Sequence, residues 1–149
     1  MPLSPHEQAA HVLRVKCAAL AGAAAEALYR ARPELARRYA HLGDGGRRHC
    51  VNDLGHHLRF LAAAVDAGDA RVFTDYAQWA FRVMVTHKVA AEDALASFHC
   101  LLDVAPAAVG PGAAGFVRDA IAAGIRSLEG TASRRPLRGG RCDPAPHDR

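Results

Sequence analysis

The sequence has no apolar stretch long enough to cross a membrane. Half of its 149 residues are hydrophobic, but alanine supplies a large share of them. No run approaches the roughly 20 apolar residues that a membrane-spanning helix needs. The first eight residues contain proline and histidine and lack the basic-then-apolar order of a secretory signal. We therefore expect a soluble protein that stays in the cytoplasm.

Cysteine pairs, metal-ligand motifs and a nucleic-acid-binding surface are also missing. The cysteines are scattered without a CxxC pair, so each is interpreted as a free thiol: Cys17, Cys50, Cys100 and Cys142. No histidines are spaced as HxxxH, so no metal site is predicted. The formal net charge of +4 comes largely from arginines near the C-terminus. No basic patch interleaved with aromatic residues indicates nucleic acid as a partner.

Strands are not predicted, because no segment alternates apolar and polar residues with a period of two. Apolar residues instead recur every three or four positions, which is typical of helices. This spacing predicts six main helices, over residues 5–29, 33–41, 47–67, 70–87, 91–102 and 114–128. Glycine and proline predict loops at 43–46 and at 106–115, the second with room for a helical turn at its start, and Asp69 is the expected N-cap of the fourth helix. The fold class is therefore all-α.

The chain is expected to divide into one folded domain, residues 1–130, and a tail, residues 131–149. A chain of this length can bury one core of ordinary size. After Gly130, arginine, proline, glycine and aspartate largely replace apolar residues. Such a composition cannot repay the entropy of ordering the backbone, so we expect a disordered basic tail.

The third predicted helix carries the residues with the most chemistry. Cys50, Asp53 and His57 lie at positions i, i+3 and i+7, so they share one helix face over about two turns. A carboxylate can accept hydrogen bonds from pyrrole N–H groups, and a thiol can add to a vinyl or ethylidene group. The set therefore suits a linear tetrapyrrole, or bilin. Taken singly, each residue type is more often a buried or solvated bystander.

The same stretch resembles the chromophore-binding helix of phycobiliproteins, whose pattern is C-x-R-D, then four residues, L-R-[YF], and A-G-D at the end. The matching residues here are 50–53 (CVND), 58–60 (LRF) and 67–69 (AGD). The sequence is also similar to bilin biosynthesis-associated globins and to globin domains that precede cobalamin-binding domains in bacterial photoreceptors. The similarity runs over residues 5–128. It implies a globin-like domain that binds a bilin such as biliverdin as its chromophore.

The resemblance also implies roles for individual residues. Cys50 stands where the phycobiliprotein thiol forms a thioether bond to the bilin, and Asp53 stands where a carboxylate contacts the inner pyrrole nitrogens. Asn52 departs from the pattern, which has an arginine that pairs with a propionate. Propionates must then be bound elsewhere, and the candidates are Arg47, Arg48, Arg59 and Arg82, with His49, His56 and His57 as further donors.

Aromatic residues are expected to flank a planar ligand, because large pockets are lined mainly by apolar and aromatic groups. Phe60, Tyr76 and Trp79 are the candidates, whereas Phe81 is expected in the core. The adjacent pair His56 and His57 is expected to tune the protonation of the bilin near neutral pH.

The chain departs from phycobiliproteins at its N-terminus as well. Too few residues precede Cys50 for the two extra helices through which phycobiliprotein subunits pair, so assembly into light-harvesting rods is not expected. The resemblance then implies a carrier, a chaperone or a partner-dependent photosensor. A second copy of the chain and a protein of bilin metabolism or signalling are the candidate partners.

Other functions fit some of these residues. His57 and His87 are separated by about the spacing of the distal and proximal histidines of haem globins, so a haem-binding gas or redox sensor is the main alternative. An enzyme is not expected, because Cys50, Asp53 and His57 lie parallel on one helix and no third group orients the imidazole. Asn52 keeps open a module that has lost its ligand.

Overall fold

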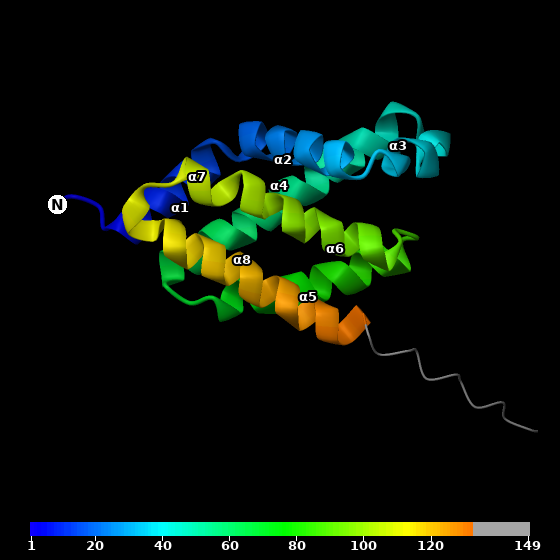
Figure 1. Ribbon diagram of the computed structural model, residues 1–149. Helices are drawn as coiled ribbons and strands as arrows, with labels where there is room; N and C mark the ends of the chain where they lie inside the picture. The colour runs from blue at the N-terminus through cyan, green and yellow to red at the C-terminus, as the bar shows by residue number, and fades with distance from the viewer. Residues whose placement is uncertain (133–149) are drawn as a thin grey trace, which may run out of the picture.

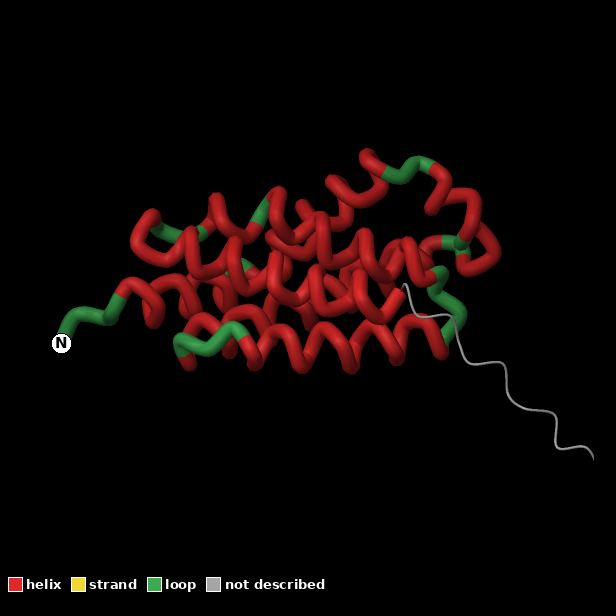
Figure 2. The backbone as a smooth tube through the Cα atoms, turned by 60° about the horizontal axis from the view of Figure 1, so that its bottom comes forward, coloured by secondary structure: helices red, strands yellow, loops and turns green. Residues whose placement is uncertain are grey.

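The computed structural model describes residues 1–132, which form a bundle of helices joined by short loops (Figures 1 and 2). The elements are α1 (Pro5–Val15), α2 (Cys17–Ala31), α3 (Glu34–Arg38), the 3-10 helix η1 (Ala40–Leu42), α4 (Asp44–Ala67), α5 (Arg71–Thr86), α6 (Ala91–His99), the 3-10 helix η2 (Cys100–Asp103), α7 (Ala105–Ala108) and α8 (Pro111–Ala132). No strand occurs within these residues. The predicted all-α class is confirmed.

The long helix α4 lies at the centre of the core. It packs against α1 and α2 and also contacts α5 and α8, while α5 lies along α8. The predicted apolar stripe of α4 has no solvent exposure at Leu54, Leu58, Leu61 and Val65. Burying each such side chain stabilises the fold by about 1.5–3 kcal/mol. The helical period therefore located the core correctly.

The helix predicted over residues 5–29 is two helices in the structure. At Lys16 the backbone leaves the helical region, with φ −92° and ψ 9°, although its N–H still bonds to the Val12 carbonyl at 2.9 Å. This bend lets α1 contact α7 and α8 while α2 contacts α6 and η2. Both helices still lie against α4, so the bend follows from the shape of the core.

The glycine-rich stretch 43–46 is a shorter turn than the predicted loop. Gly43 alone adopts a left-handed φ of 56°, and α4 already begins at Asp44. One glycine is enough to turn the chain, because the left-handed region has no steric penalty for a residue without a Cβ. The helix predicted over 33–41 is likewise divided into α3 and η1.

The helical turn expected at the start of the loop predicted over 106–115 is present as α7, but the loop ends earlier than predicted. Its first residues lie in α7, and α8 begins at Pro111, where a missing N–H costs nothing in the first helical turn. Close packing favours glycine within α8: a Cβ at Gly124 would lie 3.0 Å from the Phe73 ring. Tertiary contacts therefore outweigh the low helix propensity of glycine here.

The remaining predictions concern the start of α5 and the C-terminus. Ala70 is the N-cap position, but the Asp69 carboxylate still accepts a hydrogen bond from the Arg71 backbone N–H at 2.9 Å. Helix α8 continues to Ala132, beyond the predicted domain boundary. The predicted tail from residue 133 onward, with Cys142, lies outside the described residues. No helix within residues 1–132 has the length and apolar character needed to cross a membrane.

Candidate bilin-binding cleft

A cleft of about 570 Å³ is lined by residues of α2, α3, α4, α5 and α6. Figure 1 shows α3 at one end of the bundle. The apolar walls of the cleft come from Leu28, Leu35, Leu42, Val83, Met84 and Val89. Its polar and aromatic lining consists of Tyr29, Tyr39, His41, His49, Cys50, Asp53, His87, Lys88, Asp93 and Ser97. A cleft of this volume falls in the range of about 300–1,000 Å³ that holds small molecules and cofactors.

Helix α4 brings three of the predicted site residues to this cleft. Gly46, His49, Cys50 and Asp53 lie at i, i+3, i+4 and i+7, so one face of its first turns lines the space. Cys50 and Asp53 were predicted to act together, and both lie on the cleft wall. A ligand in this space would meet a thiol and a carboxylate one helical turn apart.

The Cys50 thiol is a weak nucleophile at neutral pH. Burial and, to a smaller extent, the nearby Asp53 carboxylate raise its pKa to about 11, although the Arg47 guanidinium opposes the shift. Thiolate, rather than thiol, attacks carbon electrophiles. Covalent attachment of a ligand at Cys50 would therefore be slow without assistance.

The Asp53 side chain is an unused hydrogen-bond acceptor. It is partly buried and forms no hydrogen bond or ion pair with any of residues 1–132. Burial raises its pKa, although the neighbouring His56, His49 and His87 act in the opposite direction. A partly buried carboxylate is less well solvated than one in bulk water, and a ligand that supplies N–H groups would compensate for that loss.

His57 lies on the same face of α4, but in the core behind the cleft. It is 1% exposed, and its ring stacks on Phe98 with 4.0 Å between the ring centroids. Its Nδ1 lies 2.6 Å from the Tyr76 hydroxyl, and its Nε2 lies 3.0 Å from Ser97 Oγ. Since no lining atom of the cleft belongs to His57, a direct ligand contact is not supported.

The hydrogen bonds around His57 determine its tautomer. The Ser97 hydroxyl donates its only hydrogen to the Ala94 carbonyl at 2.6 Å. Toward His57 it can therefore act only as an acceptor, so His57 Nε2 carries the hydrogen. His57 Nδ1 is then bare and accepts from the Tyr76 hydroxyl. Burial lowers the pKa of His57 to about 3. The expectation that His57 titrates near neutral pH was therefore wrong.

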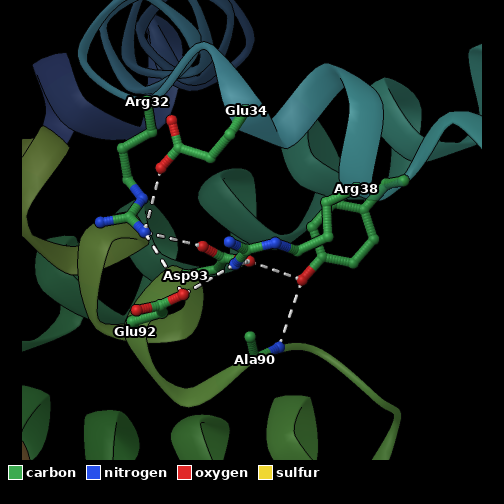
Figure 3. A network of polar contacts seen from close by, with 7 residues as sticks. Arg32, Glu34, Arg38, Ala90, Glu92 and Asp93 are labelled. Carbon is green, nitrogen blue, oxygen red and sulfur yellow. Dashed lines mark hydrogen bonds and ion pairs between the residues drawn. The ribbon is translucent and has the colours of Figure 1, made fainter.

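A network of charged side chains centred on Asp93, which lines the cleft, joins α3 to α6 (Figure 3). The buried Asp93 carboxylate accepts a hydrogen bond from Arg38 at 2.6 Å and one from the Tyr39 hydroxyl at 2.8 Å. Arg32 lies 3.2 Å from its other oxygen, and Glu92 also pairs with Arg38. These contacts join α3 and the end of α2 to the start of α6, so ion pairs and hydrogen bonds stabilise this wall of the cleft.

The profile of the family described as phycobilisome protein matches residues 5–128, which is most of the chain. The chain belongs to the phycobilisome protein family. Proteins of this family have a globin-like fold and in general bind bilin chromophores. Among curated proteins, none matches the sequence significantly.

The aromatic residues predicted to flank the chromophore of this phycobilisome-family protein lie elsewhere. Phe60 and Tyr76 are stacked with 4.1 Å between ring centroids, and the Trp79 ring is 6.2 Å from Tyr76. Phe60 is 43% exposed and Trp79 is 56% exposed, and none of the three lines the cleft. Phe81 is buried, as predicted. The aromatic lining comes instead from Tyr29 and Tyr39, neither of which was predicted as a site residue.

The basic residues predicted to pair with propionates also lie outside the cleft. They are all exposed, and none lines the space: Arg47, Arg48, Arg59, Arg82 and His56. The Arg47 guanidinium lies over the Tyr29 ring, 5.3 Å from its centroid. Of the predicted basic groups, only His49 reaches the cleft.

Lys88 is the single lysine or arginine among the residues that line the cleft. It follows α5 in a left-handed conformation, with φ 71°, where its N–H donates to the Val85 carbonyl and the Val89 N–H donates to the Met84 carbonyl. Helix ends of this kind favour glycine, and a side chain there costs about 1–2 kcal/mol. The sequence did contain one signal for Lys88. The break between the helices predicted over 70–87 and 91–102 has no glycine, so another residue must adopt the left-handed conformation there.

Proposed function

We propose that this protein binds a linear tetrapyrrole, such as biliverdin, in the cleft and carries it without chemical conversion. The observation that carries the proposal is the unpaired Asp53 carboxylate on the cleft wall. The pyrrole N–H groups of a bilin are the donors that this carboxylate lacks, and the apolar lining of α2, α3 and α5 suits the edges of the rings. Membership of the phycobilisome protein family supports the same ligand class.

We propose further that the ligand is held reversibly. Cys50 faces the cleft, but its pKa of about 11 leaves almost no thiolate at neutral pH. A protein that keeps this thiol protonated suits a carrier or chaperone that hands the bilin to another protein of bilin metabolism or signalling. A photosensor would require light-driven conversion of the bound pigment, which illumination of the complex tests directly. A homodimer is a further proposal, tested by its mass in solution.

The first experiment is a titration of the purified protein with biliverdin, followed by absorption spectroscopy. We compare the wild type with Asp53→Asn and with a matched control, His56→Asn, which changes an exposed residue three positions along α4. We expect Asp53→Asn to weaken binding by about tenfold, because an amide is a poorer acceptor than a carboxylate. The control should bind as the wild type does.

A loss of stability will not account for weaker biliverdin binding by Asp53→Asn. Because the pKa of Asp53 is raised, the native protein binds a proton more tightly than the unfolded chain, and ionisation of Asp53 at neutral pH opposes folding. Asp53→Asn should therefore be at least as stable as the wild type in thermal unfolding. Equal biliverdin affinities for wild type and Asp53→Asn would contradict the assignment of the site.

Haem is the second candidate, because His87 also lines the cleft. His57, its predicted partner, has both ring nitrogens engaged in the core. A haem complex would therefore take His87 as its histidine ligand and leave the opposite side to another group. We expect no Soret band after purification from haem-producing cells; a Soret band that His87→Ala abolishes would support haem over bilin.

A further inference from the structure

We propose that Lys88 binds a free propionate carboxylate of the tetrapyrrole, so that the cleft selects pigments whose propionates are not esterified. This inference rests on the proposed function, because it assigns a second anchor for the same ligand. Neither Asn52 nor any of the predicted arginines reaches the cleft, so the acid groups of the ligand need a different partner.

The surroundings of Lys88 leave its ammonium group available to a ligand. No carboxylate among residues 1–132 forms an ion pair with it, although two acidic residues line the same cleft. Of those two, Asp93 is already engaged by Arg32, Arg38 and Tyr39. The charge of Lys88 at the rim is therefore not neutralised within the described part of the chain.

The left-handed backbone at Lys88 indicates that a lysine occupies this position because of its side chain. It is the single residue among those described, glycine aside, that has a positive φ. The chain uses arginine for nearly all of its basic positions and contains one other lysine, Lys16. A lysine at a position that favours glycine makes the apo-protein less stable, and strained residues of this kind gather at functional sites.

Lys88 and Asp53 would hold different parts of one ligand. Asp53 lies on α4 and faces the pyrrole N–H groups, whereas Lys88 lies beyond the end of α5, at the α5–α6 connection. A propionate is a flexible arm that ends in a carboxylate, and an ammonium on a long flexible stem is a suitable partner for it. One anchor would then position the pigment core, and the other would recognise its acid side chains.

The test compares binding of biliverdin with binding of biliverdin dimethyl ester, which differs only in its propionates. The variants are Lys88→Gln and Lys88→Arg, with Lys16→Gln as the matched control at a distant exposed site. We expect the wild type and the control to bind the diacid about tenfold more tightly than the ester. Lys88→Gln should bind both forms alike, and Lys88→Arg should keep most of the preference.

A further variant, Lys88→Gly, separates the ligand role from a structural one. Glycine relieves the left-handed backbone, so we expect the melting temperature of the apo-protein to rise by about 3 °C while the preference for the diacid is lost. A wild type that binds diacid and ester equally would overturn the role of Lys88 but leave bilin binding intact. A wild type that binds neither form would overturn both proposals.

Discussion

The two halves of α4 have the same helical spacing but different surroundings. In the first turns, His49, Cys50 and Asp53 face a cleft, and in the following turns Leu54, Leu58 and Leu61 are completely buried. The difference comes from the partners of the helix. Residues of α2, α3 and the end of α5 line the cleft beside the first half, whereas the second half contacts α1 through the Arg14–Asp66 ion pair and α5 through the stacked rings of Phe60 and Tyr76.

His57 shows what this difference means for a polar side chain. It lies one helical turn from Asp53 on the same face, yet it belongs to the core, where it has two hydrogen-bond partners and a pKa far below neutrality. Asp53 lies beside a cleft and forms no hydrogen bond or ion pair with any of residues 1–132. Spacing along a helix therefore groups residues on a face, and the packing of other helices decides which of them can meet a ligand.

The largest expected effect is on stability and contrasts the two halves directly. We expect Leu61→Ala to lower the free energy of unfolding by about 2–5 kcal/mol, because it leaves a cavity among fully buried side chains. His49→Ala, on the exposed wall of the cleft, should change it by less than about 0.5 kcal/mol. Urea unfolding measures both, and similar losses would show that the cleft half is also part of the core.

The next effect concerns the reactivity of Cys50. With its pKa near 11 rather than 9, we expect iodoacetamide to modify Cys50 about a hundredfold more slowly at pH 7.5 than it modifies a cysteine in a short peptide. The rate should rise about tenfold per pH unit below the pKa, and Asp53→Asn should increase it by removing a nearby negative charge. Peptide mass spectrometry separates Cys50 from the other cysteines. Rapid modification at neutral pH would instead favour covalent pigment attachment.

A smaller effect is the loss of stability in acid. His57 has a pKa of about 3 in the native protein and about 6.5 when unfolded, so only the unfolded chain gains this proton between those values. The stabilisation is complete above pH 6.5 and decreases by up to about 1.4 kcal/mol per pH unit as the pH falls, or about 2 kcal/mol at pH 5. Urea unfolding at pH 7 and pH 5 measures this loss.

Two variants test whether His57 causes this loss of stability between pH 7 and pH 5. His57→Gln cannot titrate, so we expect its stability to differ less between pH 7 and pH 5 than that of the wild type. His56→Gln, at the exposed neighbour, should keep the full difference. If His57→Gln loses as much stability in acid as the wild type, another buried group is responsible.

The helical fold and the α4 wall of the cleft could be predicted, because both depend on the spacing of residues close together in the sequence. The stripe of α4 and the pairing of Cys50 with Asp53 follow from 3.6 residues per turn. The opposite walls of the cleft could not be predicted in this way, since Asp93 meets Arg38 across 55 positions of sequence and nothing local links them. Lys88 could not be predicted for a different reason. It stands out by its positive φ, and a backbone angle cannot be read from the sequence.

The aromatic predictions went wrong for the same reason. Phe60, Tyr76 and Trp79 do gather in one cluster, as helical spacing on α4 and α5 suggests. Phe60 and Trp79 are exposed, Tyr76 is buried between α4 and α5, and none of the three lines the cleft. Aromatic character alone does not show on which side of a helix pair a ligand enters.

Trp79, which does not touch the cleft, makes the protein its own optical reporter. It is the only tryptophan in the chain and is more than half exposed, so its fluorescence should have the red-shifted emission of an indole in water even in the native state. Unfolding would change that colour little. A pigment that absorbs in the near ultraviolet would quench the emission through space by energy transfer, so dimming of Trp79 would report when the cleft is filled and when it empties.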